Sequence, residues 1–324
     1  TAASLIKSEE CSDHFKIEIL SNVVASQIDI HKKWGGVFPE LASRAHLETM
    51  IPVLEEALEP IRQRSAVSPE VSEKLEAMNK LKVIGQVDAL AVTSGPGLIG
   101  SLLMGAETAN ILAKLFKKPL IAVNHLEGHI YSAFCTANKQ SPKANNQVVQ
   151  IPKVGIFPIL ALVVSGGHTS LILMQDHLEY EVVGQTIDDA AGEAFDKVAK
   201  IMNLGYPGGP IIEKIAKDGD ENSYKLPIGL KKEIDFSFSG LKTAVLYLTK
   251  NPSTGEKLKY NQSDLAASFQ KTVVDALILK TKKAIERYHP ETIILSGGVS
   301  ANGYLRERFI KEIEGNILIP PKNL

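Results

Sequence analysis

Two histidines stand four residues apart in the segment Asn124-His125-Leu126-Glu127-Gly128-His129. The segment follows an apolar stretch and is expected to open a helix, where this spacing puts both imidazoles on one face. Two such imidazoles could share a metal ion. The alternative is a histidine pair that is hydrogen-bonded within an ordinary helix start. The zinc-protease motif is not matched, because Leu126 follows the first histidine where that motif has a glutamate.

Glycine-containing turns provide a second set of candidate residues. They are Ser165-Gly166-Gly167-His168-Thr169, Tyr206-Pro207-Gly208-Gly209-Pro210 and Ser296-Gly297-Gly298-Val299-Ser300-Ala301-Asn302. Such a turn can direct several backbone N–H groups at a phosphate with no side chain in the way. Together the three turns favour a nucleotide site. The alternative remains that a turn after a strand often needs glycine only for a positive φ.

Acidic residues are dense in the segment 188–197, which is expected to be helical. Asp189, Glu193 and Asp196 then share one helix face. An acidic first turn that complements the helix dipole explains Asp188 and Asp189 but explains Asp196 poorly. A carboxylate that faces a glycine-rich cleft could instead hold ribose hydroxyls, and Asp196 is the candidate for that role.

Basic and aromatic residues alternate near Asp235-Phe236-Ser237-Phe238-Ser239-Gly240, with Lys231, Lys232 and Lys242 on either side. Such a mixture can contact phosphates and stacked bases of RNA. The alternative is that the lysines are only solvated surface residues.

These residues need elements to position them, and apolar stretches alternate with helical patterns along the chain. The periodicity predicts two antiparallel strands in 13–30, a helix at 44–58, and helix or loop at 62–82. It then predicts a strand at 89–93, a helix at 98–116 and a strand at 119–123. Apolar strands that enter Ser-Gly-Gly or Ser-Gly-Pro recur at residues 94, 165 and 296. The pattern indicates an α/β protein with buried sheets covered by helices.

The composition sets limits on the class of protein. The 324 residues are 44% hydrophobic and 23% charged, which excludes a disordered or fibrous chain. The apolar stretch near residues 154–164 is interrupted by Pro158 and is too short to span a membrane. The formal net charge of −1 excludes a generally basic nucleic-acid binder, so RNA contact would need a local patch. Two cysteines, Cys11 and Cys135, are too few for a disulfide scaffold.

Taken together and in order, the motifs resemble the universal tRNA N6-adenosine threonylcarbamoyltransferases, the TsaD-type family. The matching segments are residues 35–44, 94–97, 125–129, 165–169, 188–197, 206–210, 235–243 and 296–302. The resemblance implies a duplicated, two-lobed actin-like α/β fold with mixed sheets flanked by helices. We expect an N-terminal lobe at 1–135, an insertion or linker at 136–153, a second lobe at 154–290 and a C-terminal segment at 291–324.

The resemblance also implies a reaction. Threonylcarbamoyl-adenylate gives its acyl group to the exocyclic amine of the adenosine beside the tRNA anticodon, and AMP leaves. His125 and His129 are then the expected ligands of one divalent metal, zinc or iron, and they join Asp196 as catalytic residues. The residues expected to bind threonylcarbamoyl-adenylate, AMP or ATP are Val163, Val164, Ser165, Gly166, Gly167, Asp196, Gly209, Glu213 and Asn302.

Further expectations concern the ends, the partners and the location of the protein. The family's first strand with its phosphate loop would precede Thr1, and an Asp-containing segment with a third metal ligand would follow Leu324. We expect tRNA as substrate, a separate synthase that supplies the adenylate, a homodimer and no membrane contact. Divergent or inserted segments are more typical of a mitochondrial than of a bacterial cytoplasmic member.

Three other functions remain open at this point. An actin-like ATPase or small-molecule kinase would share the fold and the phosphate turns but would need no histidine pair. A metalloprotease would need a glutamate next to the first histidine. A non-catalytic assembly subunit would bind nucleotide and leave tRNA unmodified.

Overall fold

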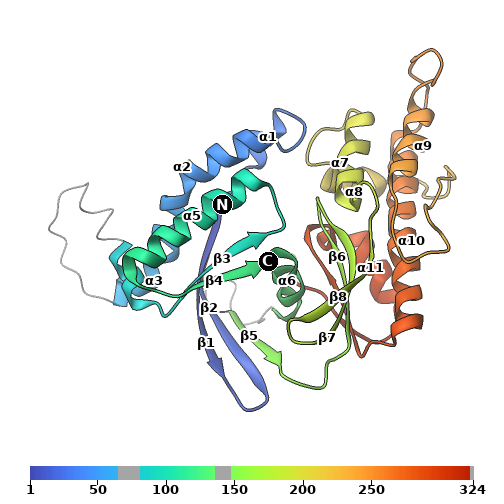
Figure 1. The fold of residues 1–324 in the computed structure, drawn as a ribbon. Coiled ribbons are helices and arrows are strands. Elements are labelled where there is room, and N and C mark those ends of the chain that lie inside the picture. Colours follow the sequence, from blue (N-terminus) through green and yellow to red (C-terminus); the bar gives the residue numbers. More distant parts are fainter. Residues whose placement is uncertain (65–80, 136–146, 322–324) are drawn as a thin grey trace. The chain divides into compact units, whose positions relative to one another are not determined.

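The computed structural model describes residues 1–64, 81–135 and 147–321. The chain forms two compact units. Unit 1 comprises Thr1–Gly128 and Cys135–Ile151, and unit 2 comprises His129–Phe134 and Pro152–Leu324. Figure 1 shows the elements of both units along the chain.

Unit 1 contains two small sheets and the helices beside them. Its elements are β1 (Ala2–Glu10), β2 (His14–Val24), α1 (Ile28–Lys32), α2 (Pro39–Ala57), α3 (Glu59–Arg64), the 3₁₀ helix η1 (Lys82–Gln86), β3 (Leu90–Gly95), α5 (Ile99–Phe116), β4 (Leu120–Asn124) and β5 (Gln147–Pro152). One sheet has the strand order β1-β2-β5, and the other pairs β3 with β4. Helix α2 packs on β1 and β2 and also against α5.

The start of the chain differs from the sequence prediction. Two antiparallel strands are expected within 13–30, but only β2 lies in that range. Its antiparallel partner β1 comes before it, with residue pairs from Ala2–Val24 to Glu10–Phe15. Residues 28–30 belong to helix α1. Helix α2 begins at Pro39, five residues before the predicted start, because proline is well suited to the first helical position.

The middle of unit 1 agrees with the sequence prediction. Strands β3 and β4 are parallel, and α5 connects them as a βαβ crossover. Strand β5 lies inside the predicted linker 136–153. Its alternating Val149 and Ile151 are buried, and the polar composition of that tract concealed them. Most of the segment 62–82, and residues 136–146 of the linker, lie outside the described residues.

Unit 2 is built on one mixed sheet. Its elements are η2 (Ser132–Phe134), β6 (Ile159–Val164), β7 (Thr169–Asp176), β8 (Glu179–Gln185), α7 (Ala191–Ile201), α8 (Gly208–Ala216), α9 (Ser239–Thr249), α10 (Gln262–Tyr288), β9 (Thr292–Ser296), η3 (Gly298–Ala301), α11 (Gly303–Glu312) and β10 (Asn316–Leu318). The strand order is β10-β9-β6-β7-β8. Strand β9 is parallel to β10 and β6, whereas β6, β7 and β8 are antiparallel.

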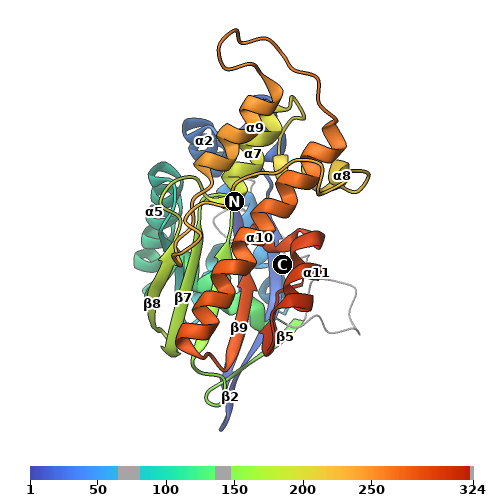
Figure 2. The same ribbon diagram turned by 90° about the vertical axis from the view of Figure 1, so that its right-hand side faces the viewer.

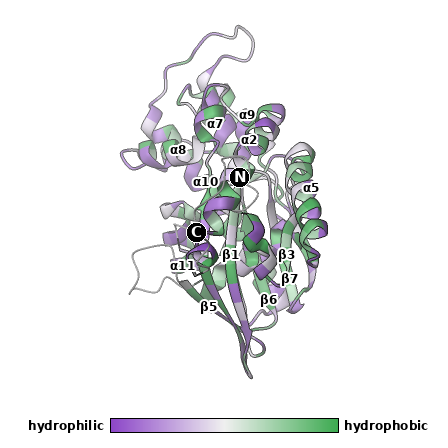
Figure 3. Cartoon of the chain, turned by 90° about the vertical axis from the view of Figure 1, so that its left-hand side faces the viewer, coloured by the Kyte–Doolittle hydropathy of each residue, from purple (hydrophilic) through white to green (hydrophobic). Residues whose placement is uncertain are grey.

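The centre of this sheet is covered on both faces. Every residue of β6 and β9 is buried, as expected for strands that read as continuous apolar stretches. Helix α10 runs along one face (Figure 2), and its Phe269, Val273 and Leu277 share a core with Leu160 and Leu295. Figure 3 shows the hydrophobic residues along β6. The rigid strand ends that result hold the turns of the candidate site.

Helix α5 keeps a hydrophobic face open within unit 1. Ile99, Ile111 and Leu115 are each more than 60% exposed, and Figure 3 shows the apolar character of this helix. Among the described residues, no helix combines the length and hydropathy needed to cross a membrane.

Candidate functional site

A cavity of about 320 Å³ opens within unit 2, where the turns after β6 and β9 meet the first residues of α7 and α8. This volume is at the lower end of the range for small-molecule sites. Figure 1 shows α7 and α8 beyond one end of β6. The lining residues are Gly166, Gly192, Phe195, Asp196, Pro207, Gly209, Pro210, Glu213, Gly298, Val299, Ala301 and Asn302.

Two glycines let the backbone segments around this cavity approach one another. At Gly208, a Cβ would lie 2.7 Å from the Asp196 Cα, so α8 can begin against α7 only with glycine there. At Gly297 the backbone has φ +88°, and a Cβ would collide with the Val164 carbonyl at the end of β6. The requirement for a positive φ therefore explains Gly297, whereas Gly166 and Gly167 have open space above them and no such φ.

Asp196 lies on α7 with its carboxylate at the wall of the cavity. One oxygen accepts a hydrogen bond from the Gly208 N–H at 2.7 Å, at the start of α8. Burial raises the pKa of this carboxyl group, and the nearby Glu193 charge raises it further, while the Gly208 hydrogen bond acts in the opposite direction. Asp196 therefore stabilises the start of α8 and presents a partly desolvated carboxylate to the cavity.

Glu213 and Asn302 connect the other two helices at the cavity. The Glu213 Oε1 accepts a hydrogen bond from the Gly303 N–H at 2.9 Å, which ties α8 to the start of α11. The Asn302 Oδ1 caps α11 by accepting from the Leu305 N–H, and its Nδ2 donates to Gln270 of α10. Both side chains hold the wall in place while they line it.

The cavity brings together five of the residues predicted to bind nucleotide: Gly166, Asp196, Gly209, Glu213 and Asn302. The Val163 and Val164 side chains are fully buried in the sheet, and Ser165 and Gly167 do not line the cavity. The turn at 165–168 joins the antiparallel strands β6 and β7. It is closed by a hydrogen bond from the Ser165 N–H to the His168 carbonyl. Of the predicted segment Val163–Gly167, only Gly166 therefore lines the cavity.

Sequence reasoning missed the apolar part of the wall. Phe195, Pro207, Pro210 and Val299 line the cavity beside the predicted residues. They lie within or next to the motifs at 188–197, 206–210 and 296–302, so proximity to those motifs was the available signal. Apolar contacts of this kind suit the faces of a purine base.

The histidine pair lies on helix α6 (His125–Tyr131), which begins directly after β4 as expected. The Asn124 Oδ1 accepts from the Leu126 N–H and so shapes the helix start. His129 lines a smaller cavity of about 130 Å³ in unit 2. Within the described part of the chain, no three His, Cys, Asp or Glu side chains are grouped as a metal site would require. The two imidazoles could supply part of a ligand set, and a metal would need at least one more protein ligand.

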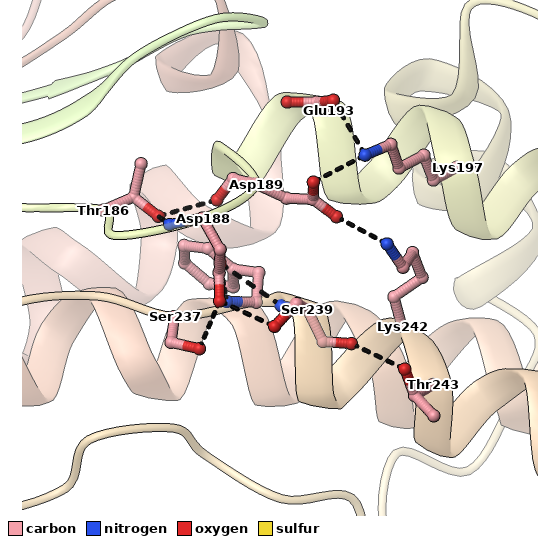
Figure 4. A network of polar contacts seen from close by, with 10 residues as sticks. Thr186, Asp188, Asp189, Glu193, Lys197, Ser237, Ser239, Lys242 and Thr243 are labelled. Carbon is pink, nitrogen blue, oxygen red and sulfur yellow. Dashed lines mark hydrogen bonds and ion pairs between the residues drawn. The ribbon is translucent and has the colours of Figure 1, made fainter.

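The other acidic residues of segment 188–197 have structural partners (Figure 4). Helix α7 begins at Ala191, so Asp188 and Asp189 precede it, contrary to the sequence prediction. Asp188 accepts hydrogen bonds from Ser237 and Ser239 and from the Phe238 N–H at the start of α9. Although burial opposes ionisation, these hydrogen bonds lower the pKa of Asp188.

Asp189 is held by two lysines. Lys197 lies 2.5 Å from one of its carboxylate oxygens and Lys242 lies 3.0 Å from the other. Burial opposes ionisation of this carboxyl group as well, but the two lysines lower its pKa overall. Lys197 also pairs with Glu193 at 2.8 Å (Figure 4), so Asp196 alone of this acidic group lines the cavity.

The idea that the aromatics of 235–240 stack on RNA bases is wrong for this structure. Phe236 and Phe238 are each 1% exposed and belong to the core of unit 2. Lys242 is engaged with Asp189, whereas Lys231 and Lys232 are exposed. The alternation of residue types reflects one side buried in the core and one side in solvent.

Residues 18–324 match the family model "TsaD: tRNA N6-adenosine threonylcarbamoyltransferase". Proteins of that name in Symbiobacterium thermophilum, Clostridium botulinum and Thermosipho africanus are 48%, 46% and 45% identical to this chain. The matches cover 91%, 94% and 94% of this chain and 76%, 81% and 82% of those proteins.

This chain belongs to that family. The resemblance found in the ordered motifs is therefore confirmed. The relatives named here are bacterial, and they do not support the mitochondrial expectation.

Solved structures support the fold class. Full-length HypF in a phosphate- and nucleotide-bound form matches with a TM-score of 0.50, and T. kodakarensis HypF matches with 0.52, both at 14% identity. The matches cover 76% and 78% of this chain but only 46% and 41% of the HypF chains. The predicted α/β class, with mixed sheets flanked by helices, is confirmed.

Proposed function

We propose that this protein transfers the threonylcarbamoyl group of threonylcarbamoyl-adenylate to the N6 amine of the adenosine beside the tRNA anticodon. The observation that carries the proposal is the cavity of unit 2, where five residues predicted to bind nucleotide meet in a chain of this transferase family. In the reaction the amine nitrogen bonds to the carbamoyl carbon and loses a proton. The bond from that carbon to the phosphate oxygen breaks, and AMP leaves with the electron pair.

The lining of the cavity fits an adenylate. The Asp196 and Glu213 carboxylates can accept hydrogen bonds from ribose hydroxyls, because each has an oxygen beyond the one used by the backbone. The exposed turn at Gly166 offers backbone to a phosphate with no side chain above it. Phe195, Pro207 and Val299 supply apolar surface for the base.

The chemistry requires help at both reacting groups. The adenine amine is a weak nucleophile because its lone pair is delocalised into the ring. The residues of this chain contribute by holding the adenylate in one orientation and by placing hydrogen-bond donors near the leaving phosphate. A divalent metal, zinc or iron, would polarise the carbamoyl group when bound.

We assign the metal-binding role to His125 and His129. Neutral imidazoles one helical turn apart suit a first-row metal ion, and the wall that contains His129 adjoins the larger cavity. Elemental analysis should find about one metal per chain, and His125→Ala should lose it. His14→Ala, which removes a histidine of strand β2, is the matched control. Full metal content in the double His125→Ala, His129→Ala variant would overturn the assignment.

The decisive test of the transferase function is nucleoside analysis of tRNA. The protein is incubated with tRNA, ATP, threonine, bicarbonate and an adenylate-forming synthase, and the digested tRNA is analysed by mass spectrometry. We expect threonylcarbamoyladenosine above a control without the protein. Its absence, with nucleotide still bound, would favour the non-catalytic subunit. ATP hydrolysis that needs neither tRNA nor synthase would favour the actin-like ATPase.

Two further expectations belong to the same proposal. A homodimer is supported by the exposed apolar residues of α5, and light scattering with Ile111→Glu tests it, since this charge should shift the mass to that of a monomer. The mitochondrial location stays a prediction, with bacterial cytoplasm as the alternative, and fractionation of the source cells tests it.

A further inference from the structure

A second cavity lies beside the nucleotide-sized cavity in unit 2. Its volume is about 130 Å³, and Gly298 and Ala301 line both cavities, so the two share a wall at the turn after β9. The other residues around it include His129 of α6, Arg306 of α11 and Pro320. A ligand that fills the larger cavity could therefore extend past this turn into the smaller one.

Arg306 gives the smaller cavity a positive charge that no carboxylate of the described residues neutralises. Its Nε donates to the Ser300 carbonyl at 2.6 Å, and one terminal nitrogen donates to the Pro320 carbonyl. Both acceptors are uncharged. Among the residues that the structure describes, no carboxylate pairs with Arg306, whereas Arg308 of the same helix pairs with Asp275 and Glu312.

An arginine in this situation favours an anion. The guanidinium has five N–H donors, and the two carbonyls leave some of them available. Burying a charge without a counter-charge is costly, and an anion at the cavity would offset that cost. Carboxylates pair with guanidinium groups through two parallel hydrogen bonds, which also fixes their orientation.

An unsatisfied hydroxyl is found on the same side of the sheet. The Ser296 Oγ is buried and has no hydrogen-bond partner among the described residues. Because side chains alternate along β9, Ser296 points away from the core side of Ile293 and Leu295, and η2 packs against β9. Ser132 of η2 and Gly297, the neighbour of Ser296, both line the smaller cavity. Ser296 itself is not among the residues that line either cavity, so its hydroxyl is not assigned a ligand contact.

We propose that the smaller cavity binds the threonyl part of the acyl donor and that Arg306 pairs with its free carboxylate. The inference rests on the proposed function, since it divides threonylcarbamoyl-adenylate between the two cavities. The adenylate half occupies the larger cavity and the amino-acid half the smaller one, with the carbamoyl–phosphate bond at the shared wall of Gly298 and Ala301. Arg306 thereby selects donors that carry a carboxylate.

The test compares two freshly synthesised donors, threonylcarbamoyl-adenylate and the analogue made from threoninamide, which has a neutral amide where the carboxylate stands. For the wild-type protein, kcat/KM for transfer to tRNA should be roughly 10- to 100-fold higher with the carboxylate donor. Arg306→Gln should abolish this preference by raising KM for the carboxylate donor, and Arg306→Lys should restore part of it. AMP affinity, measured by calorimetry, should stay unchanged in Arg306→Gln.

Arg308→Gln is the matched control, because it removes an arginine of the same helix that lines neither cavity. Its preference for the carboxylate donor should equal that of the wild type. If Arg306→Gln slows both donors equally, Arg306 only fixes the Ser300 and Pro320 carbonyls and the inference is overturned. If the wild-type protein transfers the acyl group of neither donor to tRNA, the proposed function itself is contradicted. If the wild type is active but shows no preference between the two donors, only the role of Arg306 is contradicted.

Discussion

Asp196 combines two roles that normally conflict in a single side chain. Its carboxylate holds the Gly208 N–H at the start of α8, yet burial raises its pKa and makes the ionised form costly. A group with a raised folded-state pKa contributes stability below its unfolded pKa and loses that contribution as the pH rises through the folded value. The ionised Asp196 carboxylate therefore lowers the stability of the folded protein at neutral pH. Such a cost is typical of a residue that binds a ligand.

Asp196→Asn separates the two roles. The amide oxygen can still accept from Gly208 and cannot ionise, so the free energy of unfolding should exceed that of the wild type at about pH 7 and approach it near pH 4. AMP affinity should fall by about 1.5–3 kcal/mol, because hydrogen bonds to a charged group are lost. Urea denaturation and calorimetry measure the two effects. Asp196→Ala, which also removes the Gly208 partner, is the less stable control, and unchanged AMP affinity in both variants would make Asp196 purely structural.

The candidate residues could be predicted from the sequence only in part. Asp196, Glu213 and Asn302 could be predicted because the order of the motifs along the chain matches that of the family. The motif order does not reveal that each of these side chains also accepts a hydrogen bond from a backbone N–H at the start of a helix. The cap formed by Asp188 could not be predicted, because its partner Ser237 lies 49 residues away in the sequence. Phe236 and Phe238 were misread because residue type alone does not tell a buried face from an exposed one.

At the scale of elements, the starts of helices determine the site. Asp188 acts as the cap of α9 from outside that helix, and Figure 4 shows it among the hydroxyls of Ser237 and Ser239. Asn302 caps α11, and Asp196 receives the first N–H of α8. Each cap fixes an element at the cavity or next to it, so the loss of a cap should loosen the site before it unfolds the protein.

Asp188→Ala tests this at α9. The variant leaves the Phe238 and Ser239 N–H groups without their acceptor, so the free energy of unfolding should fall by roughly 1–2 kcal/mol at neutral pH. Because the folded pKa of Asp188 is lowered, this contribution is present above its unfolded pKa and is lost as the pH falls through the folded value. Glu193→Ala, which breaks an exposed ion pair, should change stability by less than about 1 kcal/mol. Equal losses in the two variants would contradict the capping role.

The ends of β6 and β9 lie so close together that a side chain at Gly297 should destabilise the protein. Gly297→Ala adds a Cβ that meets the Val164 carbonyl, at a backbone φ of +88° that an L residue rarely adopts. We expect a loss of roughly 1–3 kcal/mol in the free energy of unfolding, measured by urea denaturation. Gly298→Ala is the control, since a Cβ there meets nothing within 4 Å and its φ is not positive. A tolerated Gly297→Ala would show that the two strand ends can separate without cost.

The topology around these elements was predicted unevenly. The βαβ crossover of β3, α5 and β4 was recovered because its apolar periodicity is strong and its turns contain glycine. Strand β5 was missed because only Val149 and Ile151 mark it within a polar tract. The antiparallel turn after β6 was also not foreseen, since a Ser-Gly-Gly sequence serves a strand-to-helix turn and a hairpin equally well.

At the scale of the whole molecule, the chain divides into two compact units, and the nucleotide-sized cavity is made by unit 2 alone. A ligand that binds the folded form of one unit stabilises that unit by mass action.

Full-chain hydrogen exchange, with and without a saturating concentration of AMP, should therefore show added protection at the starts of α7, α8 and α11. The unit 1 helices α2 and α5 should exchange at the same rate in both conditions, because the residues that line the cavity all belong to unit 2. Asp196→Asn should lose most of the added protection at the same AMP concentration. Protection confined to α2 and α5 would place the nucleotide in unit 1 and contradict the assignment of the cavity.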